Sequence, residues 1–196
     1  MNEILDLAFL MLASPRQALM KVTNEERLKE GFLLWAFVIL VLSISSLGDG
    51  SGLISQFLII FVLLGTALLI HSAVIDYISG LWGGMGTAKG ITAGFMASSV
   101  PLAFSVFFSF FDILGSTFLS GLISFAIVCW SFYLDVLAIS ENYRFRMGKA
   151  CIIALMPYVM AAAFFISLAV IGVIAAASGI SHMQDVQNMG AFLSQM

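Results

Sequence analysis

Charge is scarce in this chain of 196 residues. Lys and Arg number 8 and Asp and Glu 11, so charged residues make up 10% of the sequence, whereas 61% are hydrophobic and the mean hydropathy is +1.09. In a soluble domain about a quarter of the residues are charged. The composition therefore excludes a soluble enzyme, a nucleic-acid-binding protein and a disordered tail. The net charge of −3 is too small to imply a polyanionic partner.

Cysteine and catalytic motifs are also scarce. The two cysteines, Cys129 and Cys151, lie in apolar stretches, which excludes a disulfide framework and a cysteine-based metal cluster. Ser-His-Asp, HExxH, CxxC and paired-Glu patterns are missing, and no pair of haem ligands stands out. The glycine-rich segment 81–90 has neither the Gly-Lys-Ser/Thr ending of a P-loop nor a strand before it. We therefore expect no enzyme activity, no metal and no cofactor.

Long apolar runs dominate what remains. About 20 apolar residues suffice for a helix that crosses a bilayer, and a backbone in lipid must satisfy its own hydrogen bonds. The sequence thus predicts an all-α integral membrane protein with five transmembrane helices, preceded by short amphipathic interfacial helices. The predicted spans cover residues 31–47, 53–79, 91–111, 116–140 and 150–178. They form a transmembrane domain, residues 31–180, which follows an N-terminal segment, 1–30, and precedes a short external tail helix, 181–196.

All eight basic residues fall on one side of a five-span membrane domain. They are Arg16, Lys21, Arg27 and Lys29 before the first span, Lys89 between the second and third, and Arg144, Arg146 and Lys149 between the fourth and fifth. By the positive-inside rule this side is cytoplasmic. The N-terminus is therefore expected in the cytoplasm and the C-terminus outside, in the periplasm if the membrane is the inner membrane of a bacterium.

The N-terminal segment is expected to lie on the membrane surface. Residues 1–13 are apolar around most of a helical wheel, as in interfacial helices. A second short helix is predicted from Ser14 to about Val22, where Arg16 and Lys21 can meet anionic headgroups. Further headgroup contacts are predicted for Trp82, Lys89, Arg144, Arg146 and Lys149. A plain anchor and a site that docks a partner both fit this pattern.

Polar residues inside the spans are the candidates for function. Asp76 and Asp135 each lie about one to two turns from the cytoplasmic end of a predicted helix, and His71 lies about one and a half turns deeper than Asp76. If the two carboxylates face each other, they can share a proton or bind a cation. The alternative is that both are solvated near the interface or paired with Lys89, Arg144 or Lys149.

Small residues and prolines mark the later spans. Gly90, Gly94 and Ser98 recur at steps of four, a spacing that lets a second helix approach closely. This face predicts packing within the chain or, alternatively, dimerisation. Pro101 and Pro157 each remove a backbone hydrogen bond and are expected to kink their helices.

An ordered series of short motifs runs from about Ser14 to Ala176. These motifs are Ser14-Pro15, Gly83-Gly84-Met85-Gly86, Ala97-Ser98-Ser99-Val100-Pro101, Trp130, Lys149-Ala150 and Pro157. In this order they resemble the YIP1 family, and the chain is similar to its short bacterial members. The resemblance implies five helices and a cytosolic N-terminus. Eukaryotic members are associated with Rab GTPases and early secretory traffic, but they carry a long cytosolic N-terminal region that this sequence does not show.

Two functions remain in view. The first is a non-enzymatic membrane scaffold or adaptor that binds lipids and another integral membrane protein, or a second copy of itself. The alternative is a small oligomeric transporter or channel that uses Asp76 and Asp135 for proton or cation coupling. Nucleic acid is not expected as a partner.

Overall fold

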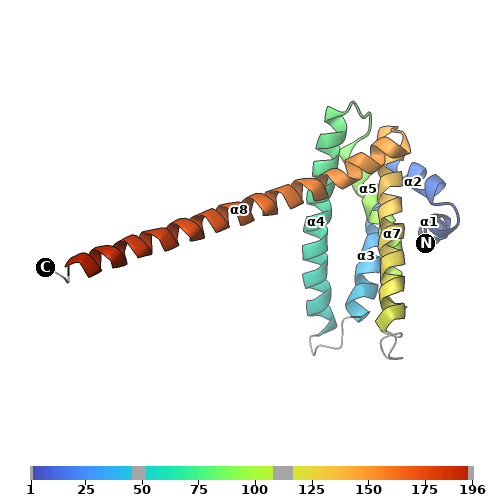
Figure 1. The fold of residues 1–196 in the computed structure, drawn as a ribbon. Helices are drawn as coiled ribbons and strands as arrows, with labels where there is room; N and C mark the ends of the chain where they lie inside the picture. Colours follow the sequence, from blue (N-terminus) through green and yellow to red (C-terminus); the bar gives the residue numbers. More distant parts are fainter. Residues whose placement is uncertain (1, 46–51, 108–116, 194–196) are drawn as a thin grey trace. The chain divides into compact units, whose positions relative to one another are not determined.

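The computed structural model describes residues 2–45, 52–107 and 117–193, with side chains for residues 4–45, 52–107 and 118–176. The elements are α1 (Asn2–Ala13), α2 (Pro15–Asn24), α3 (Leu28–Ser45), α4 (Leu53–Leu81), α5 (Ala88–Ser98), the 3-10 helix η2 (Val100–Ser105), α7 (Thr117–Tyr143) and α8 (Met147–Leu193) (Figure 1). No strand occurs in these ranges, so the all-α prediction is confirmed for them.

Four of these helices are long and apolar enough to cross a membrane. The qualifying stretches are Leu28–Ser45, Leu53–Leu81, Phe118–Tyr143 and Met147–Ala176. The prediction of five spans is not confirmed. Of the predicted third span, 91–111, the described part consists of the 11-residue α5 and the short η2, whereas residues 108–111 lie outside the described residues.

The proline in the third segment explains where its helix ends. α5 stops at Ser98, and η2 begins at Val100, directly before Pro101. Proline has no N–H to continue the hydrogen-bond ladder, and its ring disfavours the α conformation in the residue before it. The backbone therefore tightens into a 3-10 helix at this point instead of continuing as one kinked α-helix.

The C-terminal helix is longer than predicted. α8 runs through Pro157 and past residue 178 to Leu193 without a break, so the structure has no boundary between a fifth span and a separate tail helix at 181. Gly179 lies near that position, but a single glycine costs about 1 kcal/mol, too little to end a helix. Residues 194–196 of the predicted tail lie outside the described residues.

The chain divides into two compact units, residues 1–154 and residues 155–196. The second unit is the continuation of α8. In the first unit α5 is the central element, and α2, α3, α4 and α7 all pack against it. The fully buried side chains of this unit come from these helices, from α1 and from the start of α8; among them are Leu19, Ile39, Ile75, Ile91, Leu134, Leu137 and Ile153.

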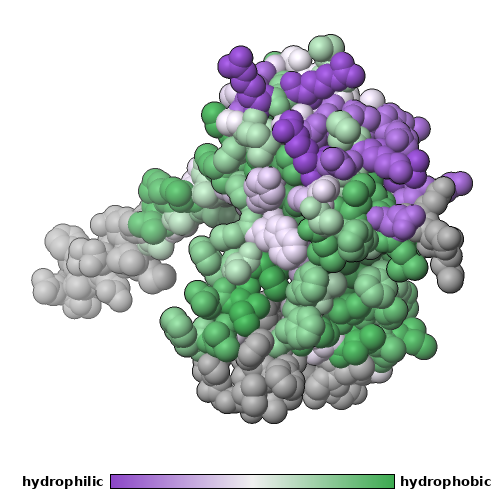
Figure 2. Space-filling model, turned by 90° about the vertical axis from the view of Figure 1, so that its right-hand side faces the viewer, coloured by the Kyte–Doolittle hydropathy of each residue, from purple (hydrophilic) through white to green (hydrophobic). Residues whose placement is uncertain are grey.

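Polar residues gather at one end of the first unit. Figure 2 shows hydrophilic residues at the top of the view and hydrophobic residues below them. We call this end, which comprises α2, the start of α3 and the connections 82–87 and 144–146, the polar end. Two hydrogen bonds join the two connections through the helices beside them. Asn142, at the end of α7, donates to the Thr87 carbonyl oxygen, and Lys149, near the start of α8, donates to the Trp82 carbonyl oxygen. All eight basic residues lie in the segments of the polar end or within three residues of them along the chain.

Candidate functional site

The glycines of the small-residue face lie inside the first unit, against α7. A Cβ atom added at Gly90 would lie 2.2 Å from Oδ1 of Asn142, and one added at Gly94 would lie 3.1 Å from Cβ of Ala138. Both distances are shorter than ordinary van der Waals contact. Glycine at these two positions therefore lets α5 and α7 approach closely, and the contacts described for this face are contacts within the chain.

The same face continues to Ser98, which meets one of the two intramembrane carboxylates. The Ser98 hydroxyl donates a hydrogen bond to Oδ1 of Asp135, and it also lies 3.0 Å from the carbonyl oxygen of Phe95 on its own helix. Going along α5, the residues 90, 94 and 98 thus meet the residues 142, 138 and 135 of the antiparallel α7. We call this line of contacts the α5–α7 seam.

A third helix, α2, closes the seam at the polar end. A Cβ atom at Gly94 would lie 2.9 Å from Cγ2 of Thr23, and one at Gly90 would lie 2.7 Å from the Thr23 carbonyl oxygen. Thr23 is 1% exposed, and its hydroxyl donates to the Leu19 carbonyl oxygen at 2.8 Å. The Thr23 side chain therefore presents its methyl group, and not its hydroxyl, to Gly94, whereas Gly90 faces the Thr23 backbone.

Thr87 joins three elements at the start of α5. Its hydroxyl oxygen accepts a hydrogen bond from the Gly90 N–H at 3.0 Å and so caps the helix. The same hydroxyl donates to Oε1 of Glu26 at 2.8 Å, and the Thr87 carbonyl oxygen accepts from Nδ2 of Asn142 at 3.0 Å. The sequence alone did not indicate a role at this site for Thr23, Thr87 or Asn142, because the contacts that place them here are with residues far along the chain.

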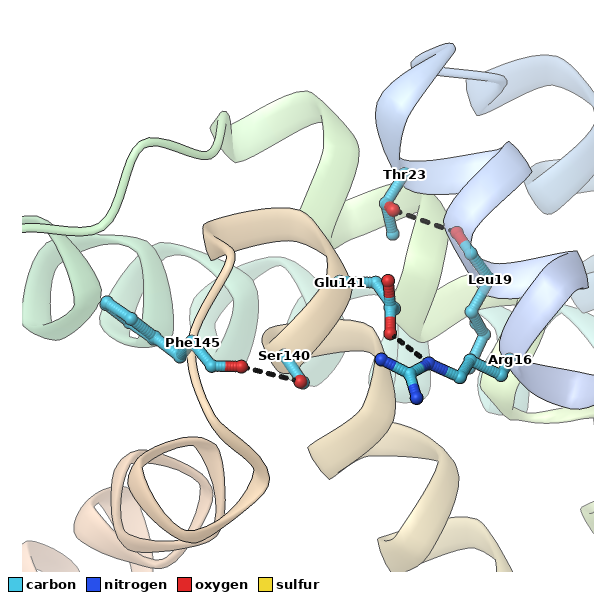
Figure 3. A network of polar contacts seen from close by, with 6 residues as sticks. All are labelled: Arg16, Leu19, Thr23, Ser140, Glu141 and Phe145. Atoms are coloured by element: carbon cyan, nitrogen blue, oxygen red, sulfur yellow. Dashed lines mark hydrogen bonds and ion pairs between the residues drawn. The ribbon is translucent and has the colours of Figure 1, made fainter.

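A second link between α2 and α7 is an ion pair. Nε of Arg16 lies 2.7 Å from Oε1 of Glu141 (Figure 3). One residue earlier on α7, the Ser140 hydroxyl donates to the Phe145 carbonyl oxygen at 2.8 Å. This hydrogen bond spans the turn in which Arg144 adopts a φ of +57°. Arg16 thus serves a contact within the protein, although its side chain remains 74% exposed.

The two intramembrane aspartates have separate partners. Asp76 of α4 accepts a hydrogen bond of 2.7 Å from the Tyr143 hydroxyl at the end of α7, whereas Asp135 accepts from Ser98 of α5. In the described ranges no hydrogen bond joins the two carboxylates. Nor does either carboxylate form a salt bridge there, since the ion pairs are Arg16–Glu141 and Arg27–Glu25. The hypothesis of one site shared by the two carboxylates therefore gains no contact from the structure.

His71, the third intramembrane candidate, packs against an aromatic ring. Its imidazole centroid lies 5.0 Å from that of Phe95, with 42° between the ring planes. This contact joins α4 to the central helix α5. Within the described residues, no group of three or more His, Cys, Asp or Glu side chains could hold a metal ion.

The residues predicted to contact headgroups divide into two sets. Nζ of Lys149 donates to the Trp82 carbonyl oxygen at 2.7 Å and lies 4.1 Å from the centroid of the Phe145 ring, so Lys149, like Arg16, is used within the protein. Four others are exposed and form no salt bridge with a described carboxylate: Lys21, Lys89, Arg144 and Arg146. Trp82 is 39% exposed.

The first helix exposes one apolar face and buries another. Leu7 and Met11 are 5% and 1% exposed, whereas Leu5, Phe9 and Leu12 are 65%, 71% and 46% exposed. The exposed residues recur at steps of four and three, so they form one stripe along the helix. We call Leu5, Phe9 and Leu12 the α1 stripe.

One comparison with known proteins identifies the family. A family model described as Yip1 domain matches residues 9–171. The chain belongs to the Yip1 family. The match confirms the resemblance found in the sequence, and together with the four long apolar helices it makes this Yip1 protein an integral membrane protein. Searches of curated proteins and of solved structures returned no match.

Proposed function

We propose that this Yip1-family protein is a non-enzymatic membrane scaffold or adaptor whose N-terminal helices bind lipid of the cytoplasmic leaflet. The α1 stripe is the observation that carries the proposal. It exposes two leucines and a phenylalanine on a helix whose opposite face is packed within the protein. Large apolar side chains arranged in one stripe on a surface helix are typical of segments that lie in the membrane interface.

α2, on which α1 packs, is attached to the transmembrane helices by buried side chains and an ion pair. Ala18, Leu19, Val22 and Thr23 of α2 are buried, and Arg16 pairs with Glu141 of α7. α1 in turn packs on α2 and α3. The α1 stripe is thus held against the transmembrane helices, so that lipid contact by α1 and the position of the spans are coupled.

The exposed basic residues supply the electrostatic part of the proposal. The four exposed basic residues lie in the segments of the polar end or, for Lys89, two residues beyond one of them: Lys21, Lys89, Arg144 and Arg146. Each can attract an anionic headgroup with about 1 kcal/mol near a membrane surface. We place the polar end in the cytoplasm, with the C-terminus outside, because basic residues gather on the cytoplasmic side of membrane proteins. The inner membrane of a bacterium is the proposed location.

A protein partner, or a second copy of the chain, would have to bind elsewhere than at the small-residue face. This face is already in contact with α7 and α2 through Gly90, Gly94 and Ser98. The alternative function, a transporter or channel with Asp76 and Asp135 as one coupling site, is not developed further, because the two carboxylates are bonded to different helices.

Lipid analysis of the extracted protein tests the proposal. The protein would be extracted with its surrounding lipid into polymer-bounded nanodiscs, and the retained phospholipids would be quantified by mass spectrometry. We expect anionic lipids to be enriched over the bulk membrane, and the enrichment to fall in the triple variant Lys89→Gln, Arg144→Gln, Arg146→Gln. Arg27→Gln is the matched control, because Arg27 is engaged by Glu25. Equal lipid composition in the wild type and the triple variant would contradict the headgroup contacts.

The adaptor part is tested on the same material. Mild extraction is expected to retain a membrane-protein partner or a second copy in constant stoichiometry. A monomer that carries neither a partner nor enriched lipid would contradict the scaffold proposal.

A further inference from the structure

Hydroxyl groups buried in helices usually donate to a carbonyl oxygen one turn earlier. Several residues of this protein do so: Thr23 donates to Leu19, Ser43 to Ile39 and Ser99 to Met96, at 2.7 to 2.8 Å. Ser72 and Ser79 of α4 are different. They are 3% and 0% exposed, and the oxygen of each hydroxyl is buried without a hydrogen-bond partner. Such groups in native proteins call for a ligand, a water molecule or an ion.

Both of these serines share a helix face with Asp76. Ser72 precedes the aspartate by four residues and Ser79 follows it by three, and residues at these spacings are neighbours on a helix surface. Tyr143 approaches this face from α7 and donates to Asp76 at 2.7 Å. A Cβ atom at Gly84 would lie 2.8 Å from Cδ1 of Tyr143 and 3.0 Å from the Ser79 carbonyl oxygen. Tyr143 therefore lies on the Ser79 side of Asp76.

The Asp76 carboxylate has no basic partner among the described side chains. Asp76 forms no salt bridge in the part of the chain that the structure describes, and it lies within a membrane-spanning helix. The Asp76 side chain is only partly buried, so its carboxylate is accessible to an ion, and a carboxylate without a basic partner can bind a cation.

We propose that Asp76, Ser79 and Tyr143 form a binding site for a monovalent cation. The oxygen atoms of the carboxylate, the Ser79 hydroxyl and the phenol are the hard ligands that such a cation prefers. One carboxylate is neutralised by one positive charge, whereas calcium sites use six to eight oxygen ligands, several of them from carboxylates. Ser72 and Ser79 are seven residues apart, about 10 Å along the helix, so one ion cannot contact both, and the position of Tyr143 selects Ser79.

This site is independent of the proposed scaffold function, because it involves neither the α1 stripe nor the exposed basic residues. Its test is the melting temperature of the purified full-length protein in detergent, measured at constant ionic strength in sodium, potassium, lithium or choline chloride. We expect at least one small cation to raise the melting temperature saturably relative to choline, by roughly 3 °C or more at ten times its Kd. Asp76→Asn and Ser79→Ala are expected to abolish this shift.

Ser43→Ala is the matched control, since Ser43 is equally buried but satisfies its hydroxyl on its own helix. It should keep the full cation response. If Asp76→Asn does not fold, equilibrium binding of radioactive sodium or rubidium to the wild type, Ser79→Ala and Ser43→Ala decides the question. Equal melting temperatures in all four salts, a response that survives in both site variants, or stability that depends on pH but not on the cation would each overturn the proposal. The last result would mean that a proton occupies the site.

Discussion

Ser98 of α5 donates a hydrogen bond to the carboxylate of Asp135 of α7. This contact ends a line that includes two glycines of α5 and the residues Ala138 and Asn142 of α7. Ser98, predicted as part of a packing or dimerisation face, thus donates to Asp135, predicted as part of a site that shares a proton or binds a cation. Both have a structural explanation inside one bundle, and that explanation can be tested by substitution.

Removal of the Ser98 hydroxyl should destabilise the protein. Ser98→Ala leaves a partly buried carboxylate without its donor, which typically costs about 1–3 kcal/mol. We expect the melting temperature to fall by roughly 2–4 °C per kcal/mol. Ser99→Ala is the control, because Ser99 donates to Met96 of its own helix. A fall in Ser99→Ala as large as that in Ser98→Ala would contradict a specific role of the Asp135 contact.

The close approach at Gly90 predicts a large effect of a single methyl group. In Gly90→Ala the new Cβ would meet Oδ1 of Asn142 at 2.2 Å and the Thr23 carbonyl oxygen at 2.7 Å, so α5 must move away from α7 and α2. Overpacking of this kind costs about 1–3 kcal/mol. Thermal unfolding in detergent measures the loss.

Gly121→Ala provides the comparison for this substitution. Gly121 lies within α7, and a Cβ there has no atom within 4 Å. Alanine is favoured over glycine in a helix by about 1 kcal/mol, so Gly121→Ala should leave stability unchanged or raise it. If both variants lose the same stability, the clash at Gly90 is not the cause.

The cap of α5 predicts a difference between two substitutions of Thr87. Thr87→Ala removes the acceptor for the Gly90 N–H and the donor to Glu26, and loss of an N-cap costs about 1 kcal/mol. Thr87→Ser keeps the hydroxyl and should retain most of the stability. Unfolding curves of the two variants, recorded side by side, measure the difference, and equal losses would show that the methyl group and not the cap is responsible.

The ion pair between Arg16 and Glu141 should matter little for stability. The arginine side chain is 74% exposed, and exposed pairs contribute about 0.2–1 kcal/mol. We expect a double-mutant cycle with Arg16→Gln and Glu141→Gln to give a coupling within this range that decreases at high salt. A coupling well above it would mean that the pair is shielded from solvent in the membrane-bound protein.

The long helices could be predicted from the sequence because lipid leaves an apolar segment no other structure. The second predicted span, 53–79, corresponds to α4 at Leu53–Leu81. The structure of the third predicted span, 91–111, was harder to predict from the sequence. Pro101 indicated a disturbance, but the change to a 3-10 helix also depends on the packing of η2 against α3 and α7, which no local pattern reveals.

The contacts of the candidate site could not be predicted, because each joins distant parts of the chain. Asn142 lies beyond the predicted end of the fourth span at 140, yet α7 continues to Tyr143. Its amide bonds to Thr87, 55 residues earlier, and this tertiary contact helps to keep polar residues helical. The partner of Asp76 is likewise 67 residues away. Residue type and spacing identified both aspartates, but the pairing depends on how α4, α5 and α7 pack.

The depth of the α1 stripe in the bilayer tests the central proposal most directly. An environment-sensitive fluorophore would be attached to Phe9→Cys in the Cys129→Ala, Cys151→Ala background, and to Gln17→Cys, an exposed position of α2, as the control. After reconstitution into anionic liposomes, we predict a blue-shifted emission from position 9 that is quenched by spin-labelled acyl chains, and an aqueous emission from position 17. An aqueous, unquenched spectrum at position 9 would contradict the binding of α1 to lipid.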